Sequence, residues 1–170
     1  MSKITTSQTI GPFSHEAFQW AADFSAAVDA APAVLIRGVI YDGDGAVIDD
    51  AQIEAWLPQA AGAEAGQPMP GFRRIPSGAD GSFSLGAPLP AAASAGEPLM
   101  YVTVFARGLV KHQFTAVFLE DDRGLEQSAI LGQVPAARRA TLVARKVAEG
   151  EYRWDIRMQG DQETVFFDYV

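Results

Sequence analysis

The sequence predicts an all-β protein, an immunoglobulin-like β-sandwich with long loops and an N-terminal arm. Short runs of alternating or β-branched residues recur along its 170 residues. Gly- and Asp-containing turn signals separate these runs, and two Pro- and Ala-rich stretches are typical of long loops. Regularly spaced short strands of this kind favour a sandwich, and the length fits a single domain.

The N-terminal region differs in character from the rest of the chain. Residues 1–13 are polar and end in a Gly-Pro-Phe bend, and such arms are loose unless they dock on something. Ser14 has the side chain of a helix N-cap and precedes a short Ala-rich segment. We therefore predict an arm and a short helix over residues 1–30, docking on a partner, and a β-sandwich domain over residues 31–170.

The sandwich is expected to begin with two strands and a tight turn. Val34–Tyr41 is rich in β-branched residues and leads into an Asp-Gly turn at residues 42–45. Gln52–Trp56 alternates polar and apolar side chains, as a half-buried strand does. Residues 57–71 hold four Ala, three Gly and three Pro, which is typical of a loop.

The middle of the chain contains the strongest strand signals. An Asp-Gly turn at residues 80–81 precedes an alternating strand over residues 82–85, and residues 86–98 are expected to form a second long loop. Met100–Phe105 and Phe114–Leu119 are dense in β-branched and aromatic residues. Both are predicted to be strands of the sandwich core.

The C-terminal third is expected to complete the set. Residues 125–132 are predicted to form one helical turn, and strands are predicted over residues 141–144, 152–158 and 165–167. A Glu-Gly turn at residues 149–150 predicts a hairpin between the first two of these strands.

Charge and composition exclude several classes of function. A net charge of -8 argues against nucleic acids and anionic membranes, which bind clustered Lys and Arg. Without cysteine the chain has no disulfides, zinc-thiolate sites or Cys nucleophile. The polar N-terminus lacks a signal core and no run approaches the ~18 apolar residues that span a bilayer, so we expect the cytoplasm.

A self-contained metal site is not expected. Non-haem iron needs three or four convergent His, Tyr or carboxylate ligands. His15 and His112 are the two histidines, far apart and without a second His at ligand spacing. The acidic cluster at residues 120–122 follows a hydrophobic strand and is typical of a solvated strand end.

Two features point to contact with a ligand. Arg107 ends a strong strand and precedes Gly108, so a loop can aim its guanidinium at a cleft and bind a carboxylate with two hydrogen bonds. Gly11-Pro12 makes a bend with little side-chain bulk, suited to close approach by a ligand. An ordinary salt-bridged Arg and a plain terminal bend remain open alternatives.

Seven ordered segments together resemble one family over nearly the whole chain. They are similar to the alpha subunits of the protocatechuate-cleaving intradiol ring-cleavage dioxygenases. The ordered set is specific, above all its last two members. The segments are Ser7–Phe13, Gly38–Gly43, Ile53–Trp56, Phe105–Gly108, Arg138–Leu142, Arg153–Gly160 and Glu163–Asp168.

This resemblance implies an intradiol dioxygenase-type β-sandwich that holds no metal itself. In the family, Fe(III) is held by two Tyr and two His of the beta subunit. The places of the His pair fall here on Leu99 and Tyr101, and that of the first Tyr falls near Glu64. The second Tyr falls in the loop at residues 88–92, which has no Tyr.

The resemblance also implies a role for this chain. It would partner the beta subunit in a higher hetero-oligomer that cleaves protocatechuate with O2 to 3-carboxy-cis,cis-muconate, in the beta-ketoadipate pathway of aromatic catabolism. No catalytic or metal-binding residue is expected here. The substrate-binding residues carried over are Thr9, Gly11, Pro12 and Arg107. The chain departs from the family in its shortened loops, particularly residues 57–71.

A free-standing β-sandwich ligand-binding module without catalysis is the alternative. It would explain the missing catalytic groups equally well and would need an exposed aromatic platform. Trp56 or Trp154 would have to supply that platform. Both lie in alternating strands, which favours burial in the core.

Overall fold

The computed structural model describes residues 22, 33–58, 64–88, 90 and 95–168. Apart from Ala22, which is helical, the predicted arm, the helix expected after Ser14 and the domain boundary near residue 30 therefore lie outside the described residues. No helix of the described part is long and apolar enough to cross a membrane.

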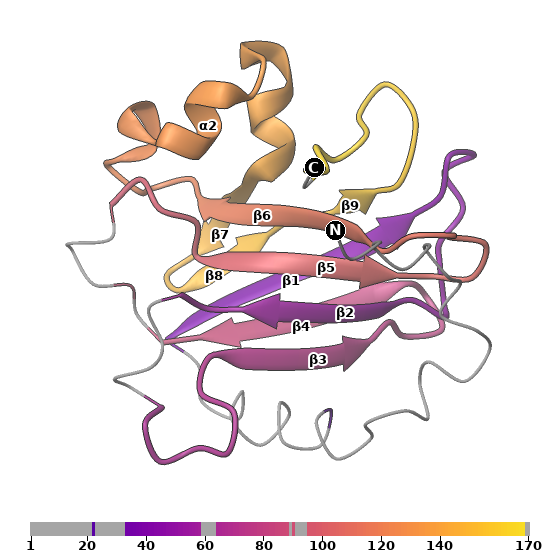
Figure 1. Cartoon of the computed structure of the whole chain (residues 1–170), viewed down its shortest axis with the longest axis horizontal. Helices are drawn as coiled ribbons and strands as arrows, with labels where there is room; N and C mark the ends of the chain where they lie inside the picture. The colour runs from indigo at the N-terminus through magenta and orange to yellow at the C-terminus, as the bar shows by residue number, and fades with distance from the viewer. Residues whose placement is uncertain (1–21, 23–32, 59–63, 89, 91–94, 169–170) are drawn as a thin grey trace, which may run out of the picture.

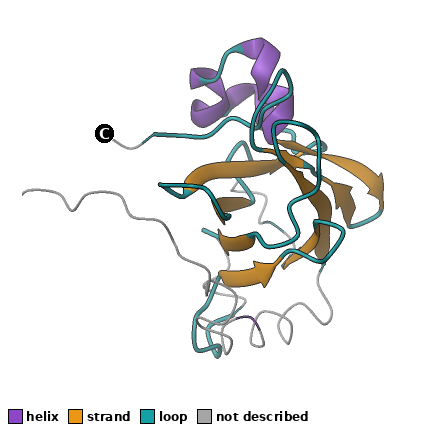
Figure 2. Ribbon diagram, turned by 90° about the vertical axis from the view of Figure 1, so that its right-hand side faces the viewer, coloured by secondary structure: helices purple, strands orange, loops and turns teal. Residues whose placement is uncertain are grey.

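The described chain forms the predicted all-β sandwich. Its strands pair in the order β3-β2-β5-β6-β7-β8-β1-β4, with β9 pairing to β1. The sheet folds over on itself, so that β1 and β4 lie behind β2 and β5 (Figures 1 and 2). The strands are β1 (Val34–Tyr41), β2 (Gln52–Trp56), β3 (Phe72–Pro76), β4 (Ser82–Ala87), β5 (Met100–Phe105), β6 (Gln113–Leu119), β7 (Val143–Ala148), β8 (Glu151–Arg153) and β9 (Ile156–Arg157).

The main hydrophobic core fills the space between the two layers. Strand β5 shows the expected alternation, because Met100, Val102 and Val104 are fully buried while the residues between them are half-buried. From the other layer, Ile36 and Leu85 contribute fully buried side chains to the same core. Alternate residues of β5 therefore point outward and are available to line a second surface.

A second, smaller core covers the outward face of β6. The helices η2 (Leu125–Gln127), α2 (Ala129–Gln133) and η3 (Ala136–Leu142) stand above this strand (Figure 1). Leu131 and Leu142 pack there against Phe118. Ser128 caps α2 by accepting a hydrogen bond from the Leu131 N–H, which confirms the helical turn predicted at residues 125–132.

The structure corrects four strand assignments. β3 was not predicted, because two Arg and a Pro hide the pattern. Thr141 and Leu142 end η3, and β7 begins only at Val143. The strand expected over 152–158 is interrupted at Trp154 and Asp155, and the Asp155 carboxylate accepts the Val39 N–H. Residues 165–167 form no strand; only the Phe167 N–H donates to the β6 backbone, at Phe114.

Candidate functional site

Arg107 lies where the sequence predicts, just beyond the end of β5. Gly108 follows it with φ +85°, a left-handed conformation that suits glycine and turns the chain away from the strand. The Arg107 side chain is 73% exposed, and its Nε forms an ion pair with Oδ2 of Asp50. The alternative of a salt-bridged surface Arg is therefore realised in this structure, although the pair does not preclude ligand binding by the rest of the guanidinium.

The other three predicted substrate-binding residues cannot be compared with Arg107. Thr9, Gly11 and Pro12 lie outside the described residues. Of the four predicted substrate-binding residues, Arg107 is therefore the one that the structure describes.

The places that correspond to the family's iron ligands hold unsuitable donors. Leu99 is aliphatic and packs against the main core. Tyr101 points outward, with its ring stacked on that of Phe114 at 5.8 Å between centroids. The carboxylate of Glu64 already accepts hydrogen bonds from Arg73 and from the Gly71 N–H. These side chains do not fit a ferric ion, which needs several convergent imidazole, phenolate or carboxylate donors.

The remaining ligand candidates do not form a cluster either. Within the described ranges, no three His, Asp or Glu residues lie close enough together to hold a metal ion. His112 rests against the ring of Phe105, with 5.6 Å between the centroids, and His15 is outside the described residues.

A buried ion pair joins Arg73 to Glu64, near which the resemblance places the first Tyr ligand. Arg73, on β3, is 1% exposed, and its Nη1 and Nη2 lie 3.1 and 2.5 Å from the two carboxylate oxygens of Glu64. Burial raises the pKa of Glu64, but hydrogen bonds from Arg73 and Gly71 and the charge of Arg73 outweigh this, and the pKa lies below the ordinary 4.5. Glu64 is therefore ionised in the folded protein.

The depressed pKa of Glu64 predicts a contribution to stability that depends on pH. Because the folded-state pKa is below the unfolded value, the carboxylate stabilises the fold fully above that unfolded value. The contribution is lost as pH falls through the folded-state pKa. We expect the difference in free energy of unfolding between the natural chain and Glu64→Gln to be constant above pH ~5 and to shrink below pH ~4. Urea unfolding at pH 7, 5, 4 and 3 measures this, and a difference that does not change with pH would contradict it.

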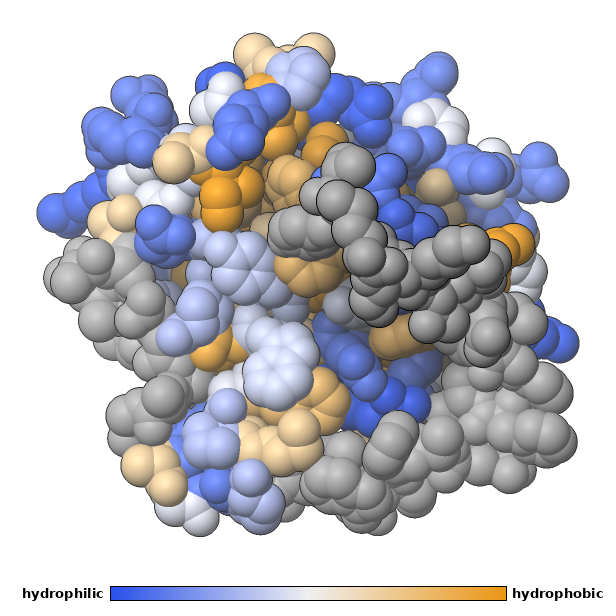
Figure 3. All heavy atoms as spheres, in the orientation of Figure 1, coloured by the Kyte–Doolittle hydropathy of each residue, from blue (hydrophilic) through white to orange (hydrophobic). Residues whose placement is uncertain are grey.

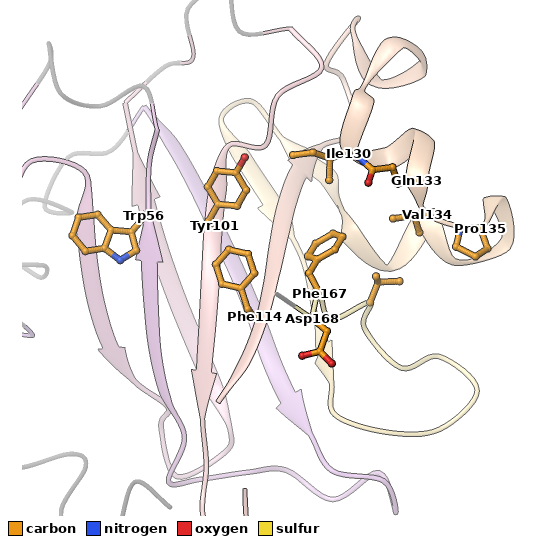
Figure 4. Close-up of a pocket in the computed structure, with 10 residues that line it drawn as sticks. Trp56, Tyr101, Phe114, Ile130, Gln133, Val134, Pro135, Phe167 and Asp168 are labelled. Carbon is orange, nitrogen blue, oxygen red and sulfur yellow. The ribbon is translucent and has the colours of Figure 1, made fainter. Parts of the chain in front are cut away.

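An apolar cavity of about 770 Å³ opens on the outward face of the sheet (Figure 4). Trp56, Tyr101 and Phe114, from β2, β5 and β6, form one wall. Residues of α2, the segment after it and the C-terminal segment form the opposite wall: Ile130, Gln133, Val134, Pro135, Val165, Phe167 and Asp168. Figure 3 shows apolar side chains gathered over this part of the face. Of the two residues that stand at the positions of the family's His ligands, Tyr101 therefore lines the cavity and Leu99 does not.

The two tryptophans have opposite surroundings. Trp154 is 3% exposed and its Nε1 donates to the Thr141 carbonyl at 2.9 Å, which confirms the expected burial. Trp56 is 46% exposed, so the expectation of burial is wrong for this residue. It is the last residue of β2, and its ring leans on Phe72 of β3 at 4.7 Å between centroids. The strand that supports Trp56 was itself missed, so the sequence carried no sign of this arrangement.

The cavity and Arg107 are separate features. Tyr101 lies near the start of β5 and Arg107 beyond its end. Arg107 is not among the residues that line the cavity.

The acidic cluster at residues 120–122 is a set of structural contacts. Asp121 accepts hydrogen bonds from the Tyr152 hydroxyl at 2.9 Å and from Lys146 at 3.0 Å. Burial and the bond to Asp121 raise the pKa of Tyr152 to about 12. Asp122 accepts the N–H groups of Gly96 and Gly124. Glu120 and Asp121 are exposed at the end of β6, as a solvated strand end would be, and Asp121 also links that end to β7 and β8.

Comparison with known proteins completes the description of the chain. No family model matches it. It is 36% identical to a protocatechuate 3,4-dioxygenase alpha chain from Burkholderia cepacia, over 98% of both chains. It is 30% identical to the protein of that name from Pseudomonas putida, over 97% of this chain and 96% of the relative. The dioxygenase domain of a carbohydrate-binding fusion protein from Streptomyces sp. SirexAA-E shares the fold, with a TM-score of 0.54 and 17% identity over 80% of this chain and 84% of that one.

Proposed function

Because this chain belongs to the family of protocatechuate 3,4-dioxygenase alpha chains, we propose that it is the non-iron-binding alpha subunit of such an enzyme. In complex with a beta subunit it takes part in the cleavage of protocatechuate by O2 to 3-carboxy-cis,cis-muconate, a step of the beta-ketoadipate pathway. The observation that carries this proposal is the identity to two alpha chains over nearly the full length of both. We place the complex in the cytoplasm.

The Fe(III) ion belongs in this proposal to the beta subunit, where it supplies the chemistry of ring cleavage. Within this chain, the support comes from the side chains that stand where the family's beta subunit has its iron ligands. The Glu64 carboxylate is hydrogen-bonded to Arg73, and the Leu99 side chain has no atom that could bind a metal ion. The chain itself contributes to the pocket by shape, by charge and by excluding water.

In this proposal, Arg107 binds the carboxylate of the substrate. Its exposed guanidinium is a local cation on a chain of net charge -8, which would otherwise repel an anionic substrate at long range. Thr9, Gly11 and Pro12 are assigned to the pocket wall, where they supply shape and backbone donors. Residues 1–30 dock on the beta subunit in this proposal, and residues 31–170 form the sandwich.

Purification of the chain alone and with its beta subunit tests the assignment. We expect iron and ring cleavage only in the mixed complex, with stoichiometric iron measured by elemental analysis and product by absorbance. If the chain alone binds one iron and cleaves protocatechuate, the proposal is wrong.

One observation favours a second function, that of a ligand-binding module without catalysis. Trp56 is exposed beside the apolar cavity, as an aromatic platform would be. Size-exclusion chromatography separates the two proposals. A module remains a monomer when the beta subunit is added, whereas an alpha subunit shifts into a large mixed assembly.

Arg107→Ala is expected to lower kcat/KM for protocatechuate by roughly 10- to 100-fold, because a hydrogen bond to a charged group contributes about 1.5–3 kcal/mol. The effect should be much smaller with catechol, which lacks the carboxylate. Steady-state kinetics of the mixed complex with both substrates measure it.

Lys111→Ala provides the matched control. Lys111 is an exposed cation in the same β5–β6 connection, and it pairs with Asp168. We expect Lys111→Ala to leave kcat/KM unchanged for both protocatechuate and catechol. Unchanged kinetics in a folded Arg107→Ala complex would remove Arg107 from the site.

A further inference from the structure

Asp50 and Arg107 face one another across two neighbouring strands. β2 and β5 pair antiparallel with Gln52 opposite Phe105, so the same register continued by two residues sets Asp50 opposite Arg107. The Asp50 side chain is only 15% exposed, whereas that of Arg107 is 73% exposed. The carboxylate is thus largely buried just before the start of β2, and the guanidinium extends from it into solvent.

Asp50 contacts Arg107 at Nε, and this choice of atom decides which N–H groups stay available for a ligand. A guanidinium presents five N–H donors in one plane, and the ion pair with Oδ2 of Asp50 is made at Nε. Arg107 has no second ion-pair partner among the residues that the structure describes. The edge formed by Nη1 and Nη2 is therefore left for another carboxylate, and end-on pairing of that edge makes two parallel hydrogen bonds.

A long, exposed Arg side chain would otherwise populate many rotamers. Gly108 gives the adjoining backbone no side chain to pack against it, and a Cβ built at Gly108 meets nothing within 4 Å. Contact with Asp50 supplies the constraint that local packing does not. It also adds a negative charge close to an anion site, so a benefit from orientation must outweigh an electrostatic cost.

We propose that Asp50 is a positioning residue: by holding Nε it fixes the guanidinium plane of Arg107, so that the Nη1–Nη2 edge faces the carboxylate of the substrate. This inference rests on the proposed function, in which Arg107 binds that carboxylate in the shared pocket. Asp50 itself touches no substrate.

Two substitutions separate orientation from charge. Asp50→Ala removes the acceptor, whereas Asp50→Asn retains a side-chain oxygen for Nε and removes only the charge. In the complex with the beta subunit, we expect Asp50→Ala to raise KM for protocatechuate about fivefold, the upper range for an exposed ion pair. Its kcat should be little changed, its KM for catechol unchanged, and Asp50→Asn should stay within about twofold of the natural complex.

Coupling to Arg107 distinguishes positioning from a general structural role. In an Arg107→Ala background, Asp50→Ala should produce no further rise in KM, because the group that it orients is gone. Additive effects in the double variant, or equal losses in Asp50→Ala and Asp50→Asn, would overturn the inference.

The proposed function and this inference fail in different ways. If Arg107→Ala leaves KM for protocatechuate unchanged, the role assigned to Arg107 is wrong. If Arg107→Ala raises KM but Asp50→Ala does not, Asp50 is not a positioning residue and the role of Arg107 stands.

Discussion

Glu64→Ala is expected to lower the free energy of unfolding of the full chain by about 3–5 kcal/mol, because it leaves a buried guanidinium without its counter-charge. Arg73 is 1% exposed, and both terminal nitrogens of its side chain face the Glu64 carboxylate. Burial makes the loss large, since water cannot replace the missing partner. Urea unfolding followed by tryptophan fluorescence at pH 7 measures the change.

A surface pair of the same chemistry provides the control. Arg37 and Glu151 lie 3.0 Å apart, with side chains 54% and 46% exposed. Glu151→Ala is expected to cost under about 1 kcal/mol. The double variant Glu64→Leu with Arg73→Met should recover most of the stability, because apolar groups of similar volume replace a buried pair at little cost. A loss at Glu64 no greater than that at Glu151 would contradict the role assigned to burial.

Gly38→Ala is expected to destabilise the fold by about 3 kcal/mol, the upper range for overpacking a core. A Cβ at Gly38 would lie 1.8 Å from the carbonyl oxygen of Trp154 and 2.4 Å from the Phe83 ring. The Phe83 ring is 5% exposed, and the Trp154 carbonyl belongs to backbone that is bonded to β1 through the Trp154 N–H and the Arg37 carbonyl. Neither neighbour can move without breaking contacts between β1 and the strands beside it.

The same methyl group added at an open position is the control for Gly38. Gly132 lies in α2, and a Cβ built there meets nothing within 4 Å. Gly132→Ala should raise stability by up to about 1 kcal/mol, because alanine favours the helix. Thermal unfolding of both variants by circular dichroism makes the comparison. Similar melting temperatures for the two would show that the close approach at Gly38 does not constrain the fold.

Local patterns were sufficient for much of the fold. The strand Gln52–Trp56 has the predicted bounds, since alternating polar and apolar side chains report directly on a half-buried strand. The turns at Gly81 and Gly150 lie where Asp-Gly and Glu-Gly place them, and both glycines have positive φ. These features depend on neighbouring residues, which is why a single sequence reveals them.

Contacts between different segments of the chain could not be predicted from local sequence patterns. β3 contains two consecutive Arg and a Pro, a composition that does not predict a strand. It forms a strand because β2 pairs beside it and because Glu64 neutralises the buried Arg73. Trp56 belongs to a correctly predicted strand, yet its exposure depends on what the neighbouring strands leave uncovered. Alternation indicates which residues share a face and does not indicate how much of that face is covered.

The sequence by itself determined the sandwich class, most of its turns and strands, and the shortage of imidazole donors, because these follow from residue types and their local spacing. Tertiary structure alone decided that Glu64 is paired with a buried Arg73 and that Asp50 holds Arg107. The two residues of each pair come from different segments of the chain, mostly turns next to strands, and their geometry is set by register and burial. Both arise only when the sheet has formed, so the orientation of the proposed substrate-binding Arg is a property of the folded chain.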